Sequence, residues 1–469
     1  MARPLRIAFQ GAARTVTGSR HLLSWGEQSW LYDCGMYQGR RDEADAINRT
    51  FKFAPKSLDA VVVSHAHLDH TGNLPTLVAQ GYRGPIHLTA PTADLSRVML
   101  TDSAKLMARD VEHVNRHRKS RPVRVPLYEM ADVETTLERF QTYHYGESFE
   151  LFRGVNATWH DAGHILGSAM TTFECEQEGR RFRLLMSGDL GRPGRAILRD
   201  PEVPKGGADA LVLDSTYGDR LHDDDAHTEQ QLVDIVRRTA ERGGRLLVPA
   251  FAVGRTQELV AVLHGLIERG AIPELPIFVD SPMARETTAV FKRHPECFDD
   301  ETRAMFQNEH GAPFGFERLR YITTVDESRS MNERKGAHII ISASGMCEGG
   351  RVLHHLQYSL GEARNTVMFV GYQGQGTLGR RLRDGVTPVN VFGEPVDVRA
   401  EIAALDGFSA HADQAEILAW VTKLDPMPRA IFLVHGEIGP METLAALLRE
   451  RTGAAVHAPE KGQEFELWT

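Results

Sequence analysis

The sequence has few cysteines, and no two of them lie close together. Only 4 occur among 469 residues, at Cys34, Cys175, Cys297 and Cys347, and they form no CxxC pair. This spacing argues against a thiolate zinc site and against a disulfide framework. Any bound metal ion would therefore be held by histidine and carboxylate side chains.

Long apolar runs are also missing. No window approaches the roughly 18 apolar residues of a membrane-spanning helix. The N-terminal residues 1–9 alternate apolar and polar side chains and lack the continuous apolar core of a secretory signal. We therefore expect a first strand at this end, no membrane partner and a cytoplasmic location.

An excess of positive charge is absent as well. The chain has 54 Lys and Arg residues against 63 Asp and Glu, a formal net charge of −9, which disfavours a general nucleic-acid coat protein. A nuclease is still compatible with this charge, because two divalent ions and a local basic cleft attract phosphates inside an acidic protein. The most basic stretch, residues 109–124, is interpreted as a solvated helix face and loop.

The chain is too long for one simple core, and its pattern of apolar and polar residues changes along its length. Short alternating runs separated by Gly-rich turns in residues 5–31 predict an antiparallel sheet. From about residue 210, strand-like apolar runs alternate with helical segments, which is typical of βαβ units around a mostly parallel sheet. The Pro- and Gly-rich stretch 191–209 is interpreted as a connector.

One short stretch carries four side chains that suit zinc. His65, His67, Asp69 and His70 follow the apolar run 60–63, which predicts a buried strand, and precede a predicted helix. Three histidines and one aspartate within six residues exceed what one tetrahedral ion with an open position uses. The cluster therefore suggests two metal ions, although a His-rich exposed loop would have the same composition.

Similar side chains follow other predicted strands. Asp33 could orient a ligand or a metal-bound water, or it could cap a turn. His160 and His164 share a Gly-punctuated loop, and their spacing does not decide which of them is a ligand. Asp189 follows the predicted strand 184–186, and a carboxylate between two cations would be deprotonated and could bridge them. The repetition argues against chance.

The βαβ region offers small residues where its predicted strands end. In open parallel sheets, ligands collect at these carboxyl ends. Small residues there let backbone amides approach a phosphate, and Arg255 could clamp one. Gln373 lies at another such end and is a further candidate for substrate binding. Tight turns need the same residue types, so each signal is weak alone.

Together these residues resemble the β-CASP group of metallo-β-lactamase-fold nucleases. The segment His65–His70 is the HxHxDH signature of the whole superfamily, which alone leaves the function open. Three later residues resemble β-CASP motifs A, B and C in the right order, namely Asp214 in LDSTYG, His411 in FSAHAD and His435 in VHGE. The resemblance implies an α/β fold, a metallo-β-lactamase αββα sandwich in residues 1–216 and 397–469 with an inserted, mostly parallel β-CASP domain in residues 217–396.

The resemblance also implies roles for the site residues. It places His65, His67 and His164 on one zinc ion. It places Asp69, His70 and His435 on a second, with Asp189 bridging the two, Asp33 in the surrounding layer and His160 a bystander. A hydroxide between the two zinc ions would attack the phosphodiester. His411, oriented by Asp214, would protonate the leaving oxygen, a role that imidazole suits because its unperturbed pKa is near 6.5.

The implied activity is hydrolysis of single-stranded RNA, leaving a 5′-phosphate and a 3′-hydroxyl. A histidine at motif C, here His435, goes with RNA processing in this group, and the complete ligand set disfavours a noncatalytic scaffold. The amino-acid sequence of residues 342–351 resembles that of the compact bacterial and archaeal type, which is similar to the catalytic core of the pre-mRNA 3′-end endonuclease. In this segment, Ser344 and Gly345 are candidates for binding the phosphate next to the scissile phosphate. We expect endonuclease rather than 5′–3′ exonuclease action, and a homodimer is one candidate assembly.

Two other functions are compatible with parts of the pattern. A small-molecule hydrolase, such as a thioesterase or lactamase, would explain the HxHxDH signature but not the insertion or His411. An RNA-binding subunit of a larger processing complex would bind RNA without cleaving it.

Overall fold

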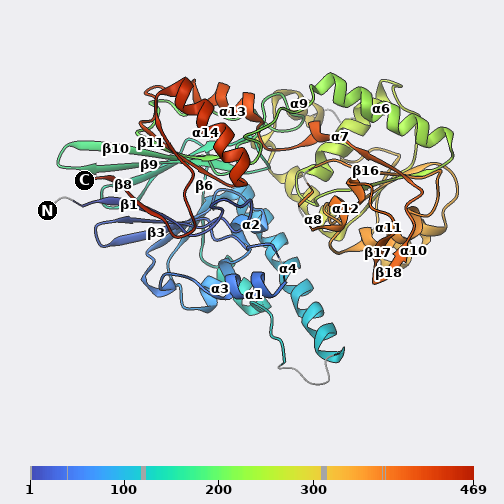
Figure 1. Ribbon diagram of the computed structural model, residues 1–469, viewed down its shortest axis with the longest axis horizontal. Coiled ribbons are helices and arrows are strands. Elements are labelled where there is room, and N and C mark those ends of the chain that lie inside the picture. The colour runs from blue at the N-terminus through green and yellow to red at the C-terminus, as the bar shows by residue number, and fades with distance from the viewer. Residues whose placement is uncertain (1–2, 40, 118–122, 308–313, 372, 375) are drawn as a thin grey trace. The chain divides into compact units, whose positions relative to one another are not determined.

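The computed structural model describes residues 3–39, 41–117, 123–307, 314–371, 373–374 and 376–469 (Figure 1). Residues 118–122 of the basic stretch lie outside the described residues. The chain divides into two compact units. Unit 1 comprises Met1–Gly194, Arg199–Leu221 and His411–Thr469, and unit 2 comprises Arg195–Leu198 and His222–Ala410. The domain boundaries expected from the sequence stay a prediction.

Unit 1 is built on two seven-stranded sheets. The first has the order β22-β1-β2-β3-β4-β5-β6 and the second the order β21-β20-β11-β10-β9-β8-β7. The first sheet consists of β1 (Leu5–Phe9), β2 (His21–Trp25), β3 (Gln28–Tyr32), β4 (Ala60–Val62), β5 (Ile86–Thr89), β6 (Phe140–Tyr143) and β22 (Glu464–Trp468). The second consists of β7 (Ser148–Phe152), β8 (Val155–Asp161), β9 (Ala169–Gln177), β10 (Arg180–Met186), β11 (Ala210–Asp214), β20 (Ala430–Val434) and β21 (Ala455–His457).

Helices cover the outer faces of both sheets. In Figure 1, α13 and α14 lie on one side of unit 1, and α1 and α3 lie on the other. The helices of this unit are α1 (Arg41–Arg49), α2 (Leu68–Thr71), α3 (Leu74–Ala79), α4 (Ala90–His117), α5 (Met130–Leu137), α13 (Gln414–Val421) and α14 (Ile438–Thr452), with a short 3₁₀ turn at Pro55–Ser57.

The alternation of side chains along the strands explains this layering. In β11, Ala210 and Val212 pack in the core between the two sheets, whereas Leu211 and Leu213 pack with α13 and α14. Successive residues of a strand point to opposite faces, so a strand that is apolar throughout must be covered on both sides. Unit 1 is therefore the αββα sandwich that the sequence predicts, and the antiparallel pairing of β1, β2 and β3 is confirmed.

Unit 2 contains a six-stranded sheet whose described pairs are all parallel. In sheet order its strands are β14 (Leu319–Tyr321), β13 (Ile277–Asp280), β15 (His338–Ser342), β12 (Arg245–Pro249), β16 (Thr366–Phe369) and β19 (Glu401–Ala404), and a separate hairpin joins β17 (Val389–Val391) to β18 (Glu394–Val396). Its helices are α6 (Asp225–Glu241), α7 (Arg255–Glu268), α8 (Pro282–Arg293), α9 (Asp300–Gln307), α10 (Val325–Glu333), α11 (Arg351–Ser359) and α12 (Leu378–Arg383), with 3₁₀ turns at Pro295–Cys297 and Asp406–Phe408.

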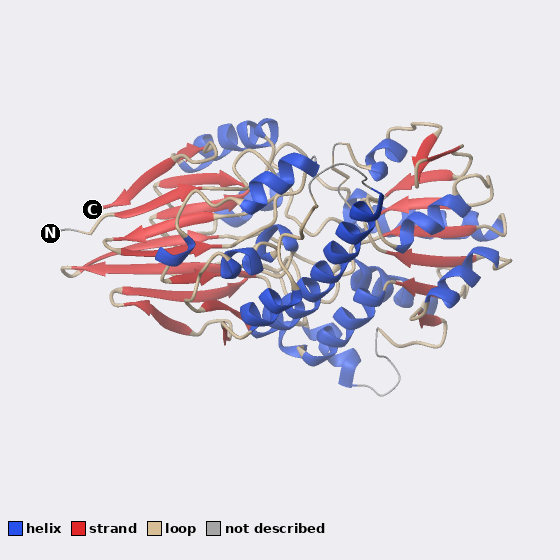
Figure 2. Ribbon diagram, turned by 90° about the horizontal axis from the view of Figure 1, so that it is seen from below, coloured by secondary structure: helices blue, strands red, loops and turns tan. Residues whose placement is uncertain are grey.

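The four central strands of this sheet, β12, β13, β15 and β16, are buried along their whole length. Strands of a parallel sheet that helices cover on both faces have continuous apolar sequences, and the sequence shows such apolar runs after about residue 210. Figure 2 shows these strands with helices packed around them. The predicted βαβ architecture is thus confirmed. No helix among the described residues combines the length and the hydropathy needed to span a lipid bilayer.

Candidate metal centre

The candidate ligands of unit 1 lie directly after strands. His65 follows β4, Asp189 follows β10 and His435 follows β20. Because β10, β11 and β20 are adjacent parallel strands, Asp189, Asp214 and His435 emerge at the same sheet edge. His435 adopts a positive φ of 53°, which non-glycine residues rarely do, and its N–H donates to Ala12 O over 2.7 Å. Such a constrained backbone is common at functional sites.

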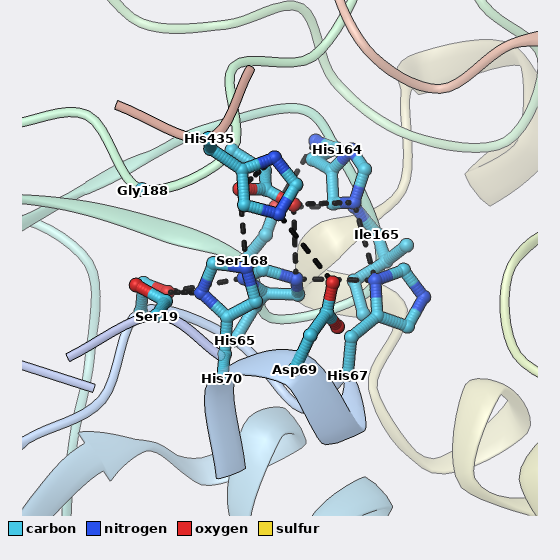
Figure 3. Close-up of polar contacts among 12 residues, drawn as sticks. Ser19, His65, His67, Asp69, His70, His164, Ile165, Ser168, Gly188 and His435 are labelled. Carbon is cyan, nitrogen blue, oxygen red and sulfur yellow. Dashed lines mark hydrogen bonds and ion pairs between the residues drawn. The ribbon is translucent and has the colours of Figure 1, made fainter. Parts of the chain in front are cut away.

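Four side chains form the first group, namely His65, His67, His164 and Asp189, with ligand atoms within 4.8 Å of one another. Figure 3 labels the three histidines of this group. His67 Nδ1 lies 3.1 Å from His65 Nε2 and 3.3 Å from His164 Nε2. Asp189 Oδ2 lies 3.5 Å from His65 Nε2 and 3.6 Å from His164 Nε2. A tetrahedral zinc ion with bonds of about 2.1 Å separates its ligand atoms by about 3.4 Å. The four distances given above, 3.1 to 3.6 Å, are close to this value.

Asp69, His70 and His435 form a second group, which faces the other oxygen of Asp189. Asp189 Oδ1 lies 3.2 Å from His70 Nε2 and 3.7 Å from His435 Nδ1. Asp69 Oδ2 lies 3.4 Å from His435 Nε2. Among the described residues, the buried atoms His70 Nε2 and Asp189 Oδ1 have no hydrogen-bond partner, which is costly unless a cation binds them. Asp189 thus turns one oxygen toward each group, as a bridging ligand would.

The charges of the metal-free site also favour a cation. Burial raises the pKa of Asp189, but His435, His70 and His65 outweigh it and hold that pKa well below its usual value. Burial lowers the pKa of His67 to about 4, so its ring is neutral and has a free lone pair near pH 7. Burial also lowers the pKa of His435, yet Asp189 and Asp69 more than offset it and raise that pKa to about 9. A metal ion would displace this proton.

A layer of hydrogen bonds orients these ligands. His70 Nδ1 donates to Asp33 Oδ2 over 2.7 Å, which turns His70 Nε2 toward the site. Asp33 Oδ1 accepts from the Ser64 N–H over 2.8 Å, and Ser64 Oγ lies 3.0 Å from His65 Nδ1. Asp33 therefore occupies the orienting position rather than that of a simple turn cap. Ser64 was not singled out from the sequence, and its place next to the first histidine was the only signal for it.

His411 and Asp214 form a hydrogen-bonded pair beside the first group. His411 Nδ1 donates to Asp214 Oδ2 over 2.9 Å, and His411 Nε2 lies 3.9 Å from Asp189 Oδ2. Asp214 also accepts from the N–H groups of Leu190 and Thr216 at 3.1 and 2.9 Å, so its carboxylate is held firmly. Thr216, another residue that the sequence did not reveal, places Oγ1 2.7 Å from Asp214 Oδ1 and 3.0 Å from the His435 ring.

His160 lies apart from both groups. Its Nε2 atom is 3.0 Å from Thr172 Oγ1, and its Nδ1 atom is 3.4 Å from Glu202 Oε1. The neighbouring loop turns His164 inward instead, because Ser168 Oγ accepts from the His164 N–H over 3.0 Å. The geometry thus favours His164, as the resemblance implied.

Replacing His160 with alanine is therefore expected to leave the zinc content unchanged. The variant should lose only about 1 kcal/mol of unfolding free energy, the contribution of an ordinary hydrogen bond. Metal analysis and urea unfolding measure these two quantities. His164→Ala is the matched variant and should lose zinc. If His160→Ala lost zinc and His164→Ala kept it, His160 would be the ligand instead of His164.

The substrate-binding candidates belong to unit 2 and follow its parallel strands. Arg255 begins α7 after β12, and its guanidinium pairs with Glu258, so its charge is partly compensated. Ser344 and Gly345 follow β15, and Ser344 Oγ accepts from the Glu348 N–H over 3.1 Å. Gln373 follows β16 and donates to Gly345 O over 3.1 Å. Gly345 and Gln373 are therefore joined at one edge of the sheet, as expected for ends of parallel strands.

Three family domains match the chain. Residues 22–179 match the metallo-beta-lactamase superfamily domain, residues 256–382 the Beta-Casp domain, and residues 395–459 the Zn-dependent metallo-hydrolase RNA specificity domain. The first of these ranges contains five of the seven candidate metal ligands, namely His65, His67, Asp69, His70 and His164, and the last contains His411 and His435.

Relatives match nearly the whole chain. Ribonuclease TTHA0252 of Thermus thermophilus is 38% identical over 447 residues, covering 95% of this chain and 96% of that protein. Transcription termination factor FttA of Methanosarcina mazei is 32% identical over 450 residues, covering 92% of this chain and 67% of that protein. FttA of Pyrococcus abyssi is 30% identical over 98% of this chain and 70% of its own length.

A solved structure supports the fold independently. The crystal structure of a protein of unknown function from Enterococcus faecalis V583 superposes with a TM-score of 0.52, covering 98% of this chain and 99% of that one. At 12% sequence identity, the similarity concerns the fold alone.

Proposed function

Because this chain belongs to the β-CASP family of metallo-β-lactamase-fold ribonucleases, we propose that it is a zinc-dependent ribonuclease that hydrolyses phosphodiester bonds of single-stranded RNA. The observation that carries this proposal is the position of Asp189, which turns one oxygen toward each ligand group, with the His411–Asp214 pair beside it. The relatives are a ribonuclease and transcription termination factors, which supports RNA as the substrate.

We assign the ligands as follows. His65, His67 and His164 would hold one zinc ion, Asp69, His70 and His435 would hold the second, and Asp189 would contribute an oxygen to each. Zinc bound at these residues would supply a water of lowered pKa, about 7, as the nucleophile for phosphorus. Asp33 keeps His70 in the tautomer that presents Nε2 to the site.

His411 delivers the proton that the departing oxygen needs. Its Nδ1–H is engaged by Asp214, so Nε2 is the atom that faces the reaction space next to Asp189. A proton on Nε2 is transferred to the 3′ oxygen of the leaving nucleotide, which yields a 3′-hydroxyl and leaves a 5′-phosphate on the other product. Asp214 is a positioning residue, because it contacts His411 and not the substrate.

The test is cleavage of single-stranded RNA by the purified full chain. We expect about two zinc ions per chain by metal analysis, RNA cleavage in their presence, and loss of cleavage after treatment with a chelator that is reversed by added zinc. Internally labelled circular RNA would be cut by an endonuclease and spared by a 5′–3′ exonuclease. We propose the endonuclease mode.

The same assay separates the alternative functions. Turnover of a thioester without RNA cleavage would identify a small-molecule hydrolase and contradict the proposal. RNA binding of undiminished affinity without cleavage by the zinc-loaded chain would identify an RNA-binding subunit.

A further inference from the structure

Three aromatic side chains lie together on the surface of unit 2. Tyr358 is 58% exposed and Phe392 is 52% exposed, and His354 is exposed as well. The rings of His354 and Phe392 have centroids 4.5 Å apart. His354 and Tyr358 are four residues apart on α11, so they share one face of the helix. We call these three residues the aromatic patch; it lies where α11 meets the β17–β18 hairpin (Figure 1).

The hairpin holds Phe392 outside the core. Val391 pairs with Glu394, so Phe392 and Gly393 form a two-residue turn, with φ values of 54° and 85°. A turn with two positive φ values favours Asn-Gly, and a bulky residue at its first position is strained. The core contacts of the hairpin come from Val389 and Val391 instead. Phe392 thus adds nothing to the core and costs backbone strain, a pattern that points to function.

Charged side chains of both signs lie near the patch, since Glu394, two residues after Phe392, is exposed as well. Arg351 lies three residues before His354 on the same face of α11, and its guanidinium is fixed by Asp280, with 2.5 Å between Nη1 and Oδ1. Arg329 on α10 is exposed. Burial is the main cause that lowers the pKa of His354, and the nearby His355 and Arg329 lower that pKa further. Asp280 is the acidic group that acts on His354, and it is buried and already paired with Arg351 and His355.

This combination fits one kind of ligand. Aromatic faces beside arginines bind single-stranded nucleic acids, because bases stack on the rings while the cations attract the phosphates. A protein partner would favour a continuous apolar surface, whereas the exposed residues near these rings include the polar Gln357 and the charged Arg329. The patch also continues from the segment of Ser344 and Gly345, since α11 begins at Arg351 and Tyr358 lies about 10 Å further along the helix.

We propose that the aromatic patch is an accessory binding site for single-stranded RNA, in which bases stack on Phe392, His354 and Tyr358. This site rests on the proposed ribonuclease function and extends it: the patch binds RNA outside the metal centre and increases affinity without taking part in the chemistry. It should therefore affect KM and RNA affinity, and leave kcat and zinc content unchanged.

The decisive variant is Phe392→Asn. Asparagine suits the first position of this turn, so the melting temperature should stay equal or rise, while the stacking surface is lost. Binding is measured by fluorescence anisotropy with a labelled single-stranded RNA on the full, zinc-loaded chain carrying His411→Ala to prevent cleavage. We expect Phe392→Asn and Tyr358→Ala each to weaken binding about tenfold, the scale of one lost stacked base. Without the His411 change, each should raise KM by a similar factor.

Two controls make the result specific. Phe392→Tyr keeps an aromatic ring and should bind like the parent protein. Met305→Ala removes a side chain that is 39% exposed on α9 of the same unit and should also have no effect. Unchanged RNA affinity and KM in Phe392→Asn and Tyr358→Ala would overturn the proposed patch while leaving the ribonuclease proposal intact.

Other outcomes are distinguishable as well. A parent protein that neither binds nor cleaves RNA would overturn both proposals. If sedimentation shows a dimer of the parent chain that Phe392→Asn dissociates, with RNA affinity unchanged, the patch is an interface between two copies of the chain and the RNA assignment is wrong.

Discussion

Replacing Asp189 with alanine is expected to abolish RNA hydrolysis. Its two oxygens face separate ligand groups, so its loss removes a ligand from both proposed zinc sites at once. We expect kcat/KM to fall by about 10⁴-fold or more, the scale seen when one member of a catalytic unit is removed. Metal analysis should find fewer than two zinc ions per chain, and steady-state cleavage of labelled RNA measures the rate.

A graded comparison tests the reason for this loss. Asp33→Asn keeps the size and shape of the side chain but weakens the hydrogen-bond acceptor that orients His70. We therefore expect a loss of about 10- to 100-fold in zinc affinity or activity. Circular dichroism of both variants checks that the αββα sandwich is intact. An Asp189→Ala protein that retains two zinc ions and cleaves RNA would contradict the bridging role.

His411→Ala is expected to keep its zinc and lose most of its rate. Asp214 holds the His411 ring next to Asp189, and general acid catalysis of the proposed kind contributes about 10²- to 10⁴-fold. The loss should fall on kcat rather than KM.

A modified substrate distinguishes proton donation from a structural role. RNA with sulfur in place of the bridging 3′ oxygen releases a thiolate, which needs no proton. His411→Ala should therefore cleave this substrate nearly as fast as the parent protein. Asp214→Asn should show the same rescue, because it acts through His411. If neither variant is rescued, His411 is not the general acid.

The two units were predicted from the sequence on different grounds. The parallel sheet of unit 2 followed from apolar runs alternating with helical segments, because strands covered on both faces must be apolar throughout, as in β15. For unit 1 the residue pattern indicated only an antiparallel sheet at its start, and the αββα sandwich followed from the family resemblance. Arg255 shows that residue type alone misleads: it suits a phosphate clamp, but Glu258, three residues further along α7, pairs with its guanidinium, and this local pair was overlooked in the sequence. Nothing in the sequence indicated a role for Phe392, because its exposure and its backbone strain depend on the hairpin around it.

By itself, the sequence determined which side chains could bind metal and that they follow strands, because both depend on residue type and local pattern. The tertiary structure decided how they are grouped. The contact between Asp69 and His435 joins residues 366 positions apart, and the one between Asp214 and His411 joins residues 197 apart. The support from Ser64 and Thr216 also arises only when parallel strands bring their carboxyl ends to one edge. Spacing alone left the choice between His160 and His164 open, and the family resemblance, not the residue pattern, implied His164 and the bridging Asp189. No local pattern encodes such distances, because they depend on how the two sheets pack.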